Sequence, residues 1–125
     1  IDNKLVEKAI NLAELSGFVD TLTDNIDTRL GERGVQLSGG QQQRVGIARA
    51  LYHDPNILIF DEATSSLDEN TEKNIMNAIN KFSRLKTIII IAHRTNTLKK
   101  CDNIFIFNQG RVIDNGNFKS LFEKS

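Results

Sequence analysis

The chain has 125 residues, 39% of them hydrophobic, which suits one small domain with a modest core. Sixteen basic residues balance sixteen acidic ones, so no net positive field favours nucleic acid or an anionic membrane. Cys101 is the only cysteine, which excludes an intrachain disulfide and fits a reducing compartment. The longest apolar run, Ile88 to Ala92, is far shorter than the roughly 20 residues that cross a bilayer.

The N-terminal segment predicts a helix followed by irregular chain. Asp2 can cap a helix from about Asn3 to Ser16, which Gly17 would end. The segment from Thr23 to Gly34 is polar and aperiodic, so we expect a loop there. The predicted helix has a broad apolar face formed by Leu5, Val6, Ala9, Ile10, Leu12 and Ala13. A short second element would follow it, with Phe18, Val19 and Leu22 as its apolar residues.

A serine followed by two glycines then begins a helix predicted over Gln41 to Tyr52. Ser38 suits the N-cap position, and Gly39 and Gly40 leave the backbone open to close approach. The free N–H groups and the positive dipole end of such a helix favour a phosphate. A lone Ser-Gly-Gly is more often an ordinary capped helix, so the downstream residues decide between the two interpretations.

After Asp54-Pro55-Asn56 breaks the chain, strands and helices alternate. Ile57–Phe60 and Thr87–Ala92 are continuous apolar runs, typical of parallel strands buried on both faces. Asp68 can cap a helix over about Glu69 to Phe82. We expect right-handed crossovers, a parallel sheet and a helix whose buried side includes Ile75, Met76 and Ile79.

The C-terminal segment predicts four short elements. Arg94–Lys100 is expected to be a short helix and Ile104–Phe107 a third strand. Asn108-Gln109-Gly110 predicts a turn into Arg111–Ile113, which would close a hairpin. Asn117–Lys124 predicts an amphipathic helix whose inward side carries Phe118, Leu121 and Phe122.

In a parallel sheet, ligands bind beyond the carboxyl ends of the strands. Asp61 and Glu62 follow the first predicted strand, and His93 follows the second. An isolated Asp-Glu pair is more often a solvated strand end, and a lone histidine is more often structural. The context of these three residues nevertheless favours function. His53, beside Asp54-Pro55, has no such context and is interpreted as a surface residue.

Four motifs, in order, resemble those of ABC-type ATPases, and the resemblance extends from about Asp2 to Ser125. Leu37–Arg44 resembles the signature motif, and Ile57–Glu62 resembles the Walker B strand. Ser65–Asp68 resembles the D-loop, and Ile91–Arg94 resembles the segment with the switch histidine.

This resemblance implies an α/β fold. We expect part of a P-loop NTPase core of the RecA-like type with parallel strands, part of the ABC helical subdomain, and a C-terminal β-hairpin plus helix. Residues from about 1 to 52 would be the helical and signature region. Residues 53–125 would extend from Walker B to the C-terminus of the core.

The resemblance also implies roles for individual residues around ATP and Mg²⁺. Asp61 would bind Mg²⁺ through water, Glu62 would be the general base, and His93 would hydrogen-bond the γ-phosphate. In the family two nucleotide-binding domains meet head to tail, so the signature would contact ATP held by a second domain. The residues implied at that shared nucleotide site are Ser38, Gly39, Gly40 and Gln41, with Ser66 and Asp68 of the D-loop.

A P-loop is absent from the sequence. The loop requires G-x-x-x-x-G-K-[ST], and no Gly-Lys pair occurs anywhere in the chain. We expect the Walker A motif, the base-stacking aromatic residue and the Q-loop upstream of Ile1. The chain would then be the C-terminal half of a nucleotide-binding domain and inactive alone. A missing neighbouring strand would leave an apolar edge, so we also expect self-association.

The leading hypothesis is a fragment of an exporter-type ABC transporter at the cytoplasmic face of a membrane. Thr28–Gly34 resembles the X-loop of exporters, in which Glu32 would contact a fused or separate transmembrane domain. The segments Asp61–Asp68 and Ala92–Arg94 also favour the exporter type. The sequence does not indicate the transported substrate, because substrate contacts would belong to the transmembrane domain.

Two alternatives remain. DNA-repair and chromosome-organising ATPases share the signature, but they usually have glutamate where Gln41 stands, and they carry long heptad arms. No sustained heptads and no basic duplex-binding face occur here. The other alternative is a non-catalytic dimerisation or interaction fragment, which the missing P-loop favours for the isolated chain.

Overall fold

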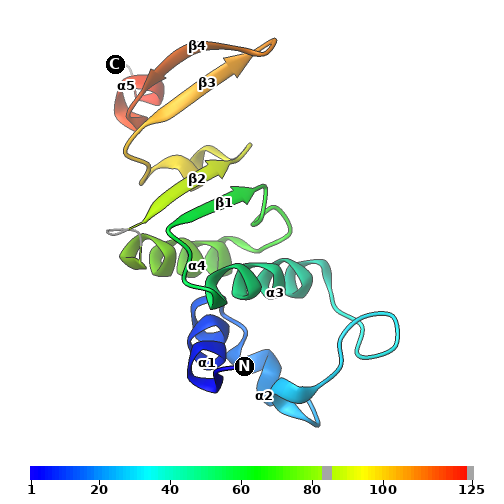
Figure 1. Ribbon diagram of the computed structural model, residues 1–125. Helices are drawn as coiled ribbons and strands as arrows, with labels where there is room; N and C mark the ends of the chain where they lie inside the picture. Colours follow the sequence, from blue (N-terminus) through cyan, green and yellow to red (C-terminus); the bar gives the residue numbers. More distant parts are fainter. Residues whose placement is uncertain (83–85, 124–125) are drawn as a thin grey trace. The chain divides into compact units, whose positions relative to one another are not determined.

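The computed structural model describes residues 1–82 and 86–123, and the chain divides into two compact units, Ile1–Ile91 and Ala92–Ser125. The first unit is a mixed α/β arrangement of helices and one strand pair (Figure 1). Its elements are α1 (Asn3–Leu12), α2 (Ser16–Asp20), the 3-10 turn η1 (Asn25–Asp27), α3 (Gly39–Tyr52), β1 (Ile57–Asp61), α4 (Glu69–Phe82) and β2 (Thr87–Ile91).

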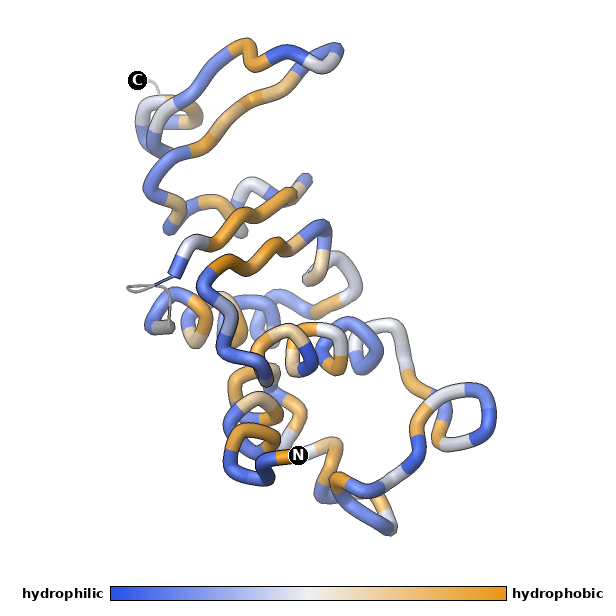
Figure 2. Tube along the Cα trace, viewed as in Figure 1, coloured by the Kyte–Doolittle hydropathy of each residue, from blue (hydrophilic) through white to orange (hydrophobic). Residues whose placement is uncertain are grey.

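The two apolar runs form a parallel strand pair, as predicted. Leu58 lies opposite Ile88, and Phe60 lies opposite Ile90. Apart from Asp61 at the end of β1 and Thr87 at the start of β2, both strands are strongly hydrophobic (Figure 2). The α4 crossover between them begins and ends at the predicted residues. The sequence pattern therefore identified this βαβ unit correctly.

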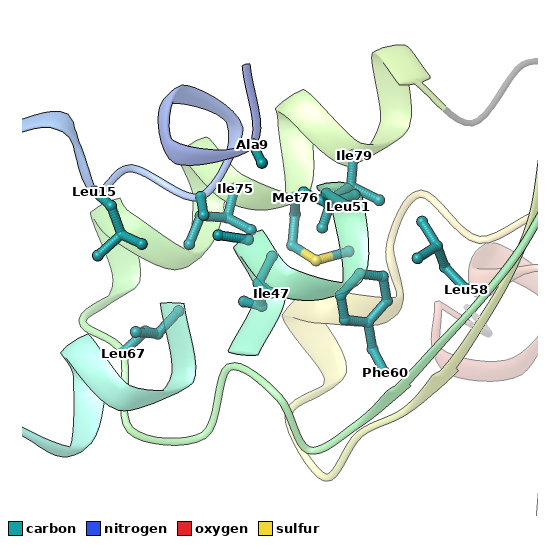
Figure 3. Close-up of a cluster of buried hydrophobic side chains, with 12 residues drawn as sticks. Ala9, Leu15, Ile47, Leu51, Leu58, Phe60, Leu67, Ile75, Met76 and Ile79 are labelled. Atoms are coloured by element: carbon teal, nitrogen blue, oxygen red, sulfur yellow. The ribbon is translucent and has the colours of Figure 1, made fainter. Parts of the chain in front are cut away.

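One hydrophobic core joins α1, α3, α4 and one face of the strand pair (Figure 3). Ile75 and Ile79 of α4 are almost completely inaccessible, at 0% and 1% exposure, and Met76 is buried beside them. This confirms the predicted buried side of α4. The cluster consists of Ala9, Ala13, Leu15, Ile47, Ala48, Leu51, Leu58, Phe60, Leu67, Ile75, Met76 and Ile79.

The opposite face of the strand pair is open, so the prediction of strands buried on both faces is wrong for the described residues. Ile57 and Ile59 of β1 are 60% and 64% exposed, and Ile89 and Ile91 of β2 are 47% and 49% exposed. A parallel sheet normally has helices on both faces. Within the described part of the first unit, the core packs against one face only.

The first helix is shorter than predicted. Asp2 caps it as expected, because its carboxylate accepts from the Lys4 N–H at 2.8 Å. The helix ends at Leu12, however, and Glu14 adopts a left-handed φ of 56°. This turn allows Leu15 to enter the core, where it is 3% exposed. Gly17 lies inside α2 and does not end the first helix.

The predicted loop over Thr23–Gly34 contains little regular structure. The short turn η1 interrupts it, and a bridge joins Leu30 to Val35 beyond its end. Glu32 is exposed between the two bridged residues.

The second unit contains η3 (Thr95–Leu98), β3 (Ile104–Asn108), β4 (Arg111–Gly116) and α5 (Phe118–Phe122). The predicted hairpin is present, with Gln109 and Gly110 at φ of 49° and 75°, as in the mirror-image turns that match strand twist. β3 pairs with β4 in antiparallel orientation, with a register shift between Ile106 and Phe107. Such a hairpin needs only contacts between residues close in sequence, which is why the local turn signal predicted it.

Two helix predictions in this unit need correction. The helix expected over Arg94–Lys100 is the four-residue 3-10 turn η3. The C-terminal helix is α5, capped by Asn117, and Lys124 lies outside the described residues. Phe122 is 42% exposed, so it does not face inward as predicted, although its ring lies 5.0 Å from that of Phe118. A five-residue helix on a two-stranded hairpin has too little opposing surface to bury both rings.

Candidate functional site

The signature segment begins α3 with a complete capping box. Ser38 Oγ accepts from the Gln41 N–H at 3.2 Å, and Gln41 Oε1 accepts from the Ser38 N–H at 2.9 Å. The Gln42 N–H donates to the Ser38 carbonyl at 2.9 Å. Among the described residues, the N–H groups of Gly39 and Gly40 have no acceptor. Two donors at the positive end of a 14-residue helix are therefore available to an anion.

The two signature glycines also allow the D-loop to pack closely against α3. A methyl group added at Gly39 would lie 3.6 Å from Cβ and Oγ of Ser66. A methyl group added at Gly40 would lie 3.3 Å from the Ser66 carbonyl oxygen and 3.5 Å from Cδ2 of Leu67. The glycines thus serve packing as well as an open helix start, and they bring Ser66 next to the signature.

Gln43 joins α3 to the turn that follows β1. Its Oε1 accepts from the Ser66 N–H at 2.9 Å, and its Nε2 donates to Ser65 Oγ at 2.9 Å. The same Nε2 lies 3.4 Å from the Glu62 carbonyl oxygen. Sequence reasoning missed this residue. The available signal was its spacing of three and four residues from Gly40 and Gly39, which places it on the same face of the helix.

Asp61 and Glu62 lie at the carboxyl end of β1, and both are exposed. The Glu62 N–H donates to the Ile91 carbonyl at 2.9 Å, across the parallel pair. Glu62 has a left-handed φ of 50°, which is disfavoured for a residue with a side chain. Such conformations persist where surrounding contacts determine them, and they concentrate at functional sites.

The D-loop turn is also attached to α4. Thr64 Oγ1 donates to Glu72 Oε1 at 3.1 Å, and both residues are buried. Asp68 caps α4 as predicted: its carboxylate accepts from the Thr71 hydroxyl at 2.6 Å and from the Thr71 N–H at 2.9 Å. The hydrogen bond from the Thr71 hydroxyl, and then the one from the Thr71 N–H, lower the pKa of Asp68 below its usual value.

The predicted site residues therefore fall into two groups. In the first unit, Gly39 and Gly40 of the signature segment pack against Ser66, and the neighbouring Gln43 hydrogen-bonds Ser65 and Ser66. His93 belongs to the second unit, where it is exposed two residues after the end of β2. His53 is exposed, as predicted, and its ring packs edge-on against Tyr52.

The donor set at β1 fits one mode of Mg²⁺ binding. No group of three or more histidine, cysteine, aspartate or glutamate residues that could hold a metal occurs in residues 1–82 and 86–123. Mg²⁺ commonly uses only one or two carboxylates and takes its other ligands from water and substrate phosphates. The exposed Asp61 carboxylate suits that mode.

Across the two described segments, no helix combines the length and apolar character needed to span a bilayer.

A parallel strand pair joined by a helix and ending in two carboxylates places the first unit among α/β domains, whose ligands bind beyond the carboxyl ends of the strands. The family model for the ABC transporter matches residues 2–65. The chain belongs to this family.

Known relatives agree with this assignment. The chain is 46% identical over 95% of its length to the heterocyst differentiation ATP-binding protein HepA of Nostoc sp.. It is 44% identical over 95% of its length to the ATP-dependent lipid A-core flippase of Vibrio vulnificus. A bacterial Atm1-family ABC exporter solved with ATP bound superposes with a TM-score of 0.90, at 40% identity over 98% of the chain.

The chain spans only part of these proteins. It covers 20% of the length of HepA and of the flippase, and 21% of the exporter chain.

Proposed function

We propose that this chain is the C-terminal part of the ATP-hydrolysing domain of an exporter-type ABC transporter. The family supports ATP hydrolysis by longer proteins of this kind, and the names of the flippase and the Atm1-family exporter support export. The observation that carries the proposal is the helix start at Gly39 and Gly40. Two N–H donors there have no acceptor among the described residues, and the Cα side of both glycines packs against Ser66 of the D-loop that follows Glu62.

In this proposal the signature binds the γ-phosphate of ATP held by a second nucleotide-binding domain. The N–H groups of Gly39 and Gly40 donate to phosphate oxygens. The Ser38 hydroxyl uses a lone pair for its cap, so its proton is still available for donation. Gln41 Oε1 is already used within the capping box, which leaves only its Nε2 for the phosphate. Ser66 and Asp68 lie on the adjacent D-loop and would face the same partner.

The strand-end residues serve the chain's own nucleotide. Asp61 would hold Mg²⁺, which neutralises phosphate charge when bound. Glu62 would accept the proton of the attacking water, and His93 would hydrogen-bond the γ-phosphate. The P-loop lysine must come from outside these 125 residues, because the sequence contains no Gly-Lys pair.

Further partners follow from the same assignment. A transmembrane domain, fused or separate, would contact the exposed Glu32 in the loop closed by the Leu30–Val35 bridge. The domain would then work at the cytoplasmic face of the membrane. We propose no role in nucleic-acid binding, since the net charge is zero.

The test is ATP hydrolysis by the longer protein that contains this segment. We expect Glu62→Gln to lower kcat by about 100-fold or more while Mg-ATP binding persists, because the substitution removes the base and keeps the shape of the side chain. Glu7→Gln, a matched change at an exposed position of α1, should leave kcat unchanged. Wild-type turnover in Glu62→Gln would refute the assignment of the base.

The isolated chain provides a second test. A non-catalytic fragment is the alternative that the missing P-loop favours, so we expect neither Mg-ATP binding by calorimetry nor phosphate release from the 125 residues alone. Turnover that Glu62→Gln abolishes in this chain would mean that another segment replaces the P-loop.

A further inference from the structure

Gln43 uses both ends of its side-chain amide at one turn. Its oxygen accepts from the Ser66 N–H at 2.9 Å, while its nitrogen donates to Ser65 Oγ at 2.9 Å and approaches the Glu62 carbonyl at 3.4 Å. The side-chain amide of glutamine offers an uncharged donor and an uncharged acceptor on one planar group. This pair of groups matches the N–H and the two oxygen atoms that the turn presents to Gln43.

The same part of α3 is attached on its other side by Arg44. Its Nη1 donates to the Glu14 carbonyl at 2.6 Å, and its Nε donates to the Gly40 carbonyl at 3.4 Å. The first part of the signature helix is thus linked to the turn after α1 through Arg44 and to the D-loop through Gln43. A displacement of the helix start would be transmitted in both directions.

Gln43 also bears on the conformation of Glu62. The Glu62 N–H donates to the Ile91 carbonyl at 2.9 Å, and the Glu62 carbonyl accepts from the Ser65 N–H at 3.1 Å. The Gln43 nitrogen of α3 adds a second donor to the Glu62 carbonyl, at 3.4 Å. A left-handed glutamate depends on such contacts to persist.

We propose that Gln43 is a positioning residue that couples the signature segment to Glu62. The inference rests on the proposed function, in which the signature binds one ATP and Glu62 acts on another. Phosphate binding at Gly39 and Gly40 would then fix Glu62 through a path of α3, the Gln43 amide and the D-loop turn. One nucleotide site would thereby control the geometry of the base at the other.

The experiment compares Gln43→Ala with Asn74→Ala in the longer protein, measuring kcat, KM for Mg-ATP and the thermal midpoint. Asn74 is exposed on α4 and lies outside the signature and D-loop segments, so it controls for the loss of a helical side-chain amide. We expect Gln43→Ala to lower kcat by about 10-fold or more, because a base displaced slightly loses much of its effect. KM should stay within about two-fold, and Asn74→Ala should match the wild type.

Two further variants separate positioning from simple stability. Gln43→Glu keeps the acceptor for the Ser66 N–H and loses the donor, so its kcat should lie between those of the wild type and Gln43→Ala. In a cycle of Gln43→Ala with Ser65→Ala, the combined loss of kcat should be smaller than the product of the single losses. The inference would be overturned if the loss of kcat in the double variant equalled the product of the two single losses. It would also be overturned if Gln43→Ala kept the wild-type kcat.

Failure of the proposed function gives a different result. If the longer protein has no ATP hydrolysis that depends on Glu62, both the function and the coupling are refuted. If the hydrolysis depends on Glu62 but not on Gln43, the function stands and only the coupling is refuted.

Discussion

Gly40 and Gly46 lie on the same helix but have different surroundings. A methyl group at Gly46 would meet no atom within 4 Å, whereas one at Gly40 would meet the Ser66 carbonyl oxygen at 3.3 Å. Replacing a glycine inside a helix with alanine normally stabilises the helix. Where the new methyl group would press against a backbone atom, the same replacement destabilises the fold. The two positions therefore separate helix propensity from packing at the scale of one residue.

We expect Gly46→Ala to raise the free energy of unfolding by about 0.5–1 kcal/mol, since it removes backbone freedom from the unfolded chain. Gly40→Ala should instead lower it by about 1 kcal/mol, because the D-loop must move away from the new methyl group. Urea unfolding of the chain followed by circular dichroism measures both. An equal gain in the two variants would contradict the packing of Ser66 against Gly40.

At the scale of elements, the caps and turns set where each helix begins. Asp2, Ser38, Asp68 and Asn117 each accept a backbone N–H in the first turn of the helix that follows. Such caps satisfy donors that have no partner inside the helix.

The Asp68 cap of α4 predicts a dependence of stability on pH. The Thr71 hydrogen bonds lower the pKa of Asp68 in the folded chain, so the carboxylate stabilises the fold above its unfolded pKa of about 3.9. This contribution is lost as the pH falls through the lower, folded pKa. We expect Asp68→Ala to have a lower thermal midpoint than the wild type at pH 7. The difference should shrink below about pH 4.

Thermal unfolding of both proteins over a pH series checks this expectation. Thr71→Val supplies a matched control, because it removes the hydroxyl and keeps the N–H bond. Its pH dependence should be intermediate. A difference between wild type and Asp68→Ala that stays constant down to pH 2 would contradict the role of the charge.

At the scale of the whole molecule, the open face of the strand pair predicts self-association. Four isoleucines lie on that face, and in the described residues β1 pairs only with β2, so its other edge is unpaired. An apolar strand with a free edge favours pairing with another chain. We expect the isolated chain to scatter light as a dimer or larger species, and Ile59→Lys to shift it toward monomer. A clean wild-type monomer would contradict the expectation.

An exposed lysine substitution elsewhere controls for added charge in that experiment. Ile113→Lys is suitable, because Ile113 is 61% exposed on β4 in the second unit. The same reduction in association by both variants would point to charge repulsion and not to the β1 face.

The sequence by itself determined the order of motifs, the βαβ unit and the caps at Asp2, Ser38 and Asp68. These features depend on residues close together along the chain, whose hydrogen bonds and periodicity form locally. The candidate residues Ser38–Gln41 and Asp61–Glu62 were identified for the same reason. Their assigned roles stay predictions, as does the division at residues 52 and 53.

Only the tertiary structure decided the break at Glu14, the open face at Ile57 and Ile59, and the bridge made by Gln43. Each depends on contacts between segments distant in sequence, such as the 23 residues that separate Gln43 from Ser66. A periodic pattern marks a residue as apolar or helical, but it does not say which segment will lie opposite. Which segments lie opposite each other is decided by tertiary packing, because the arrangement must fill the core and also give the buried polar groups hydrogen-bond partners.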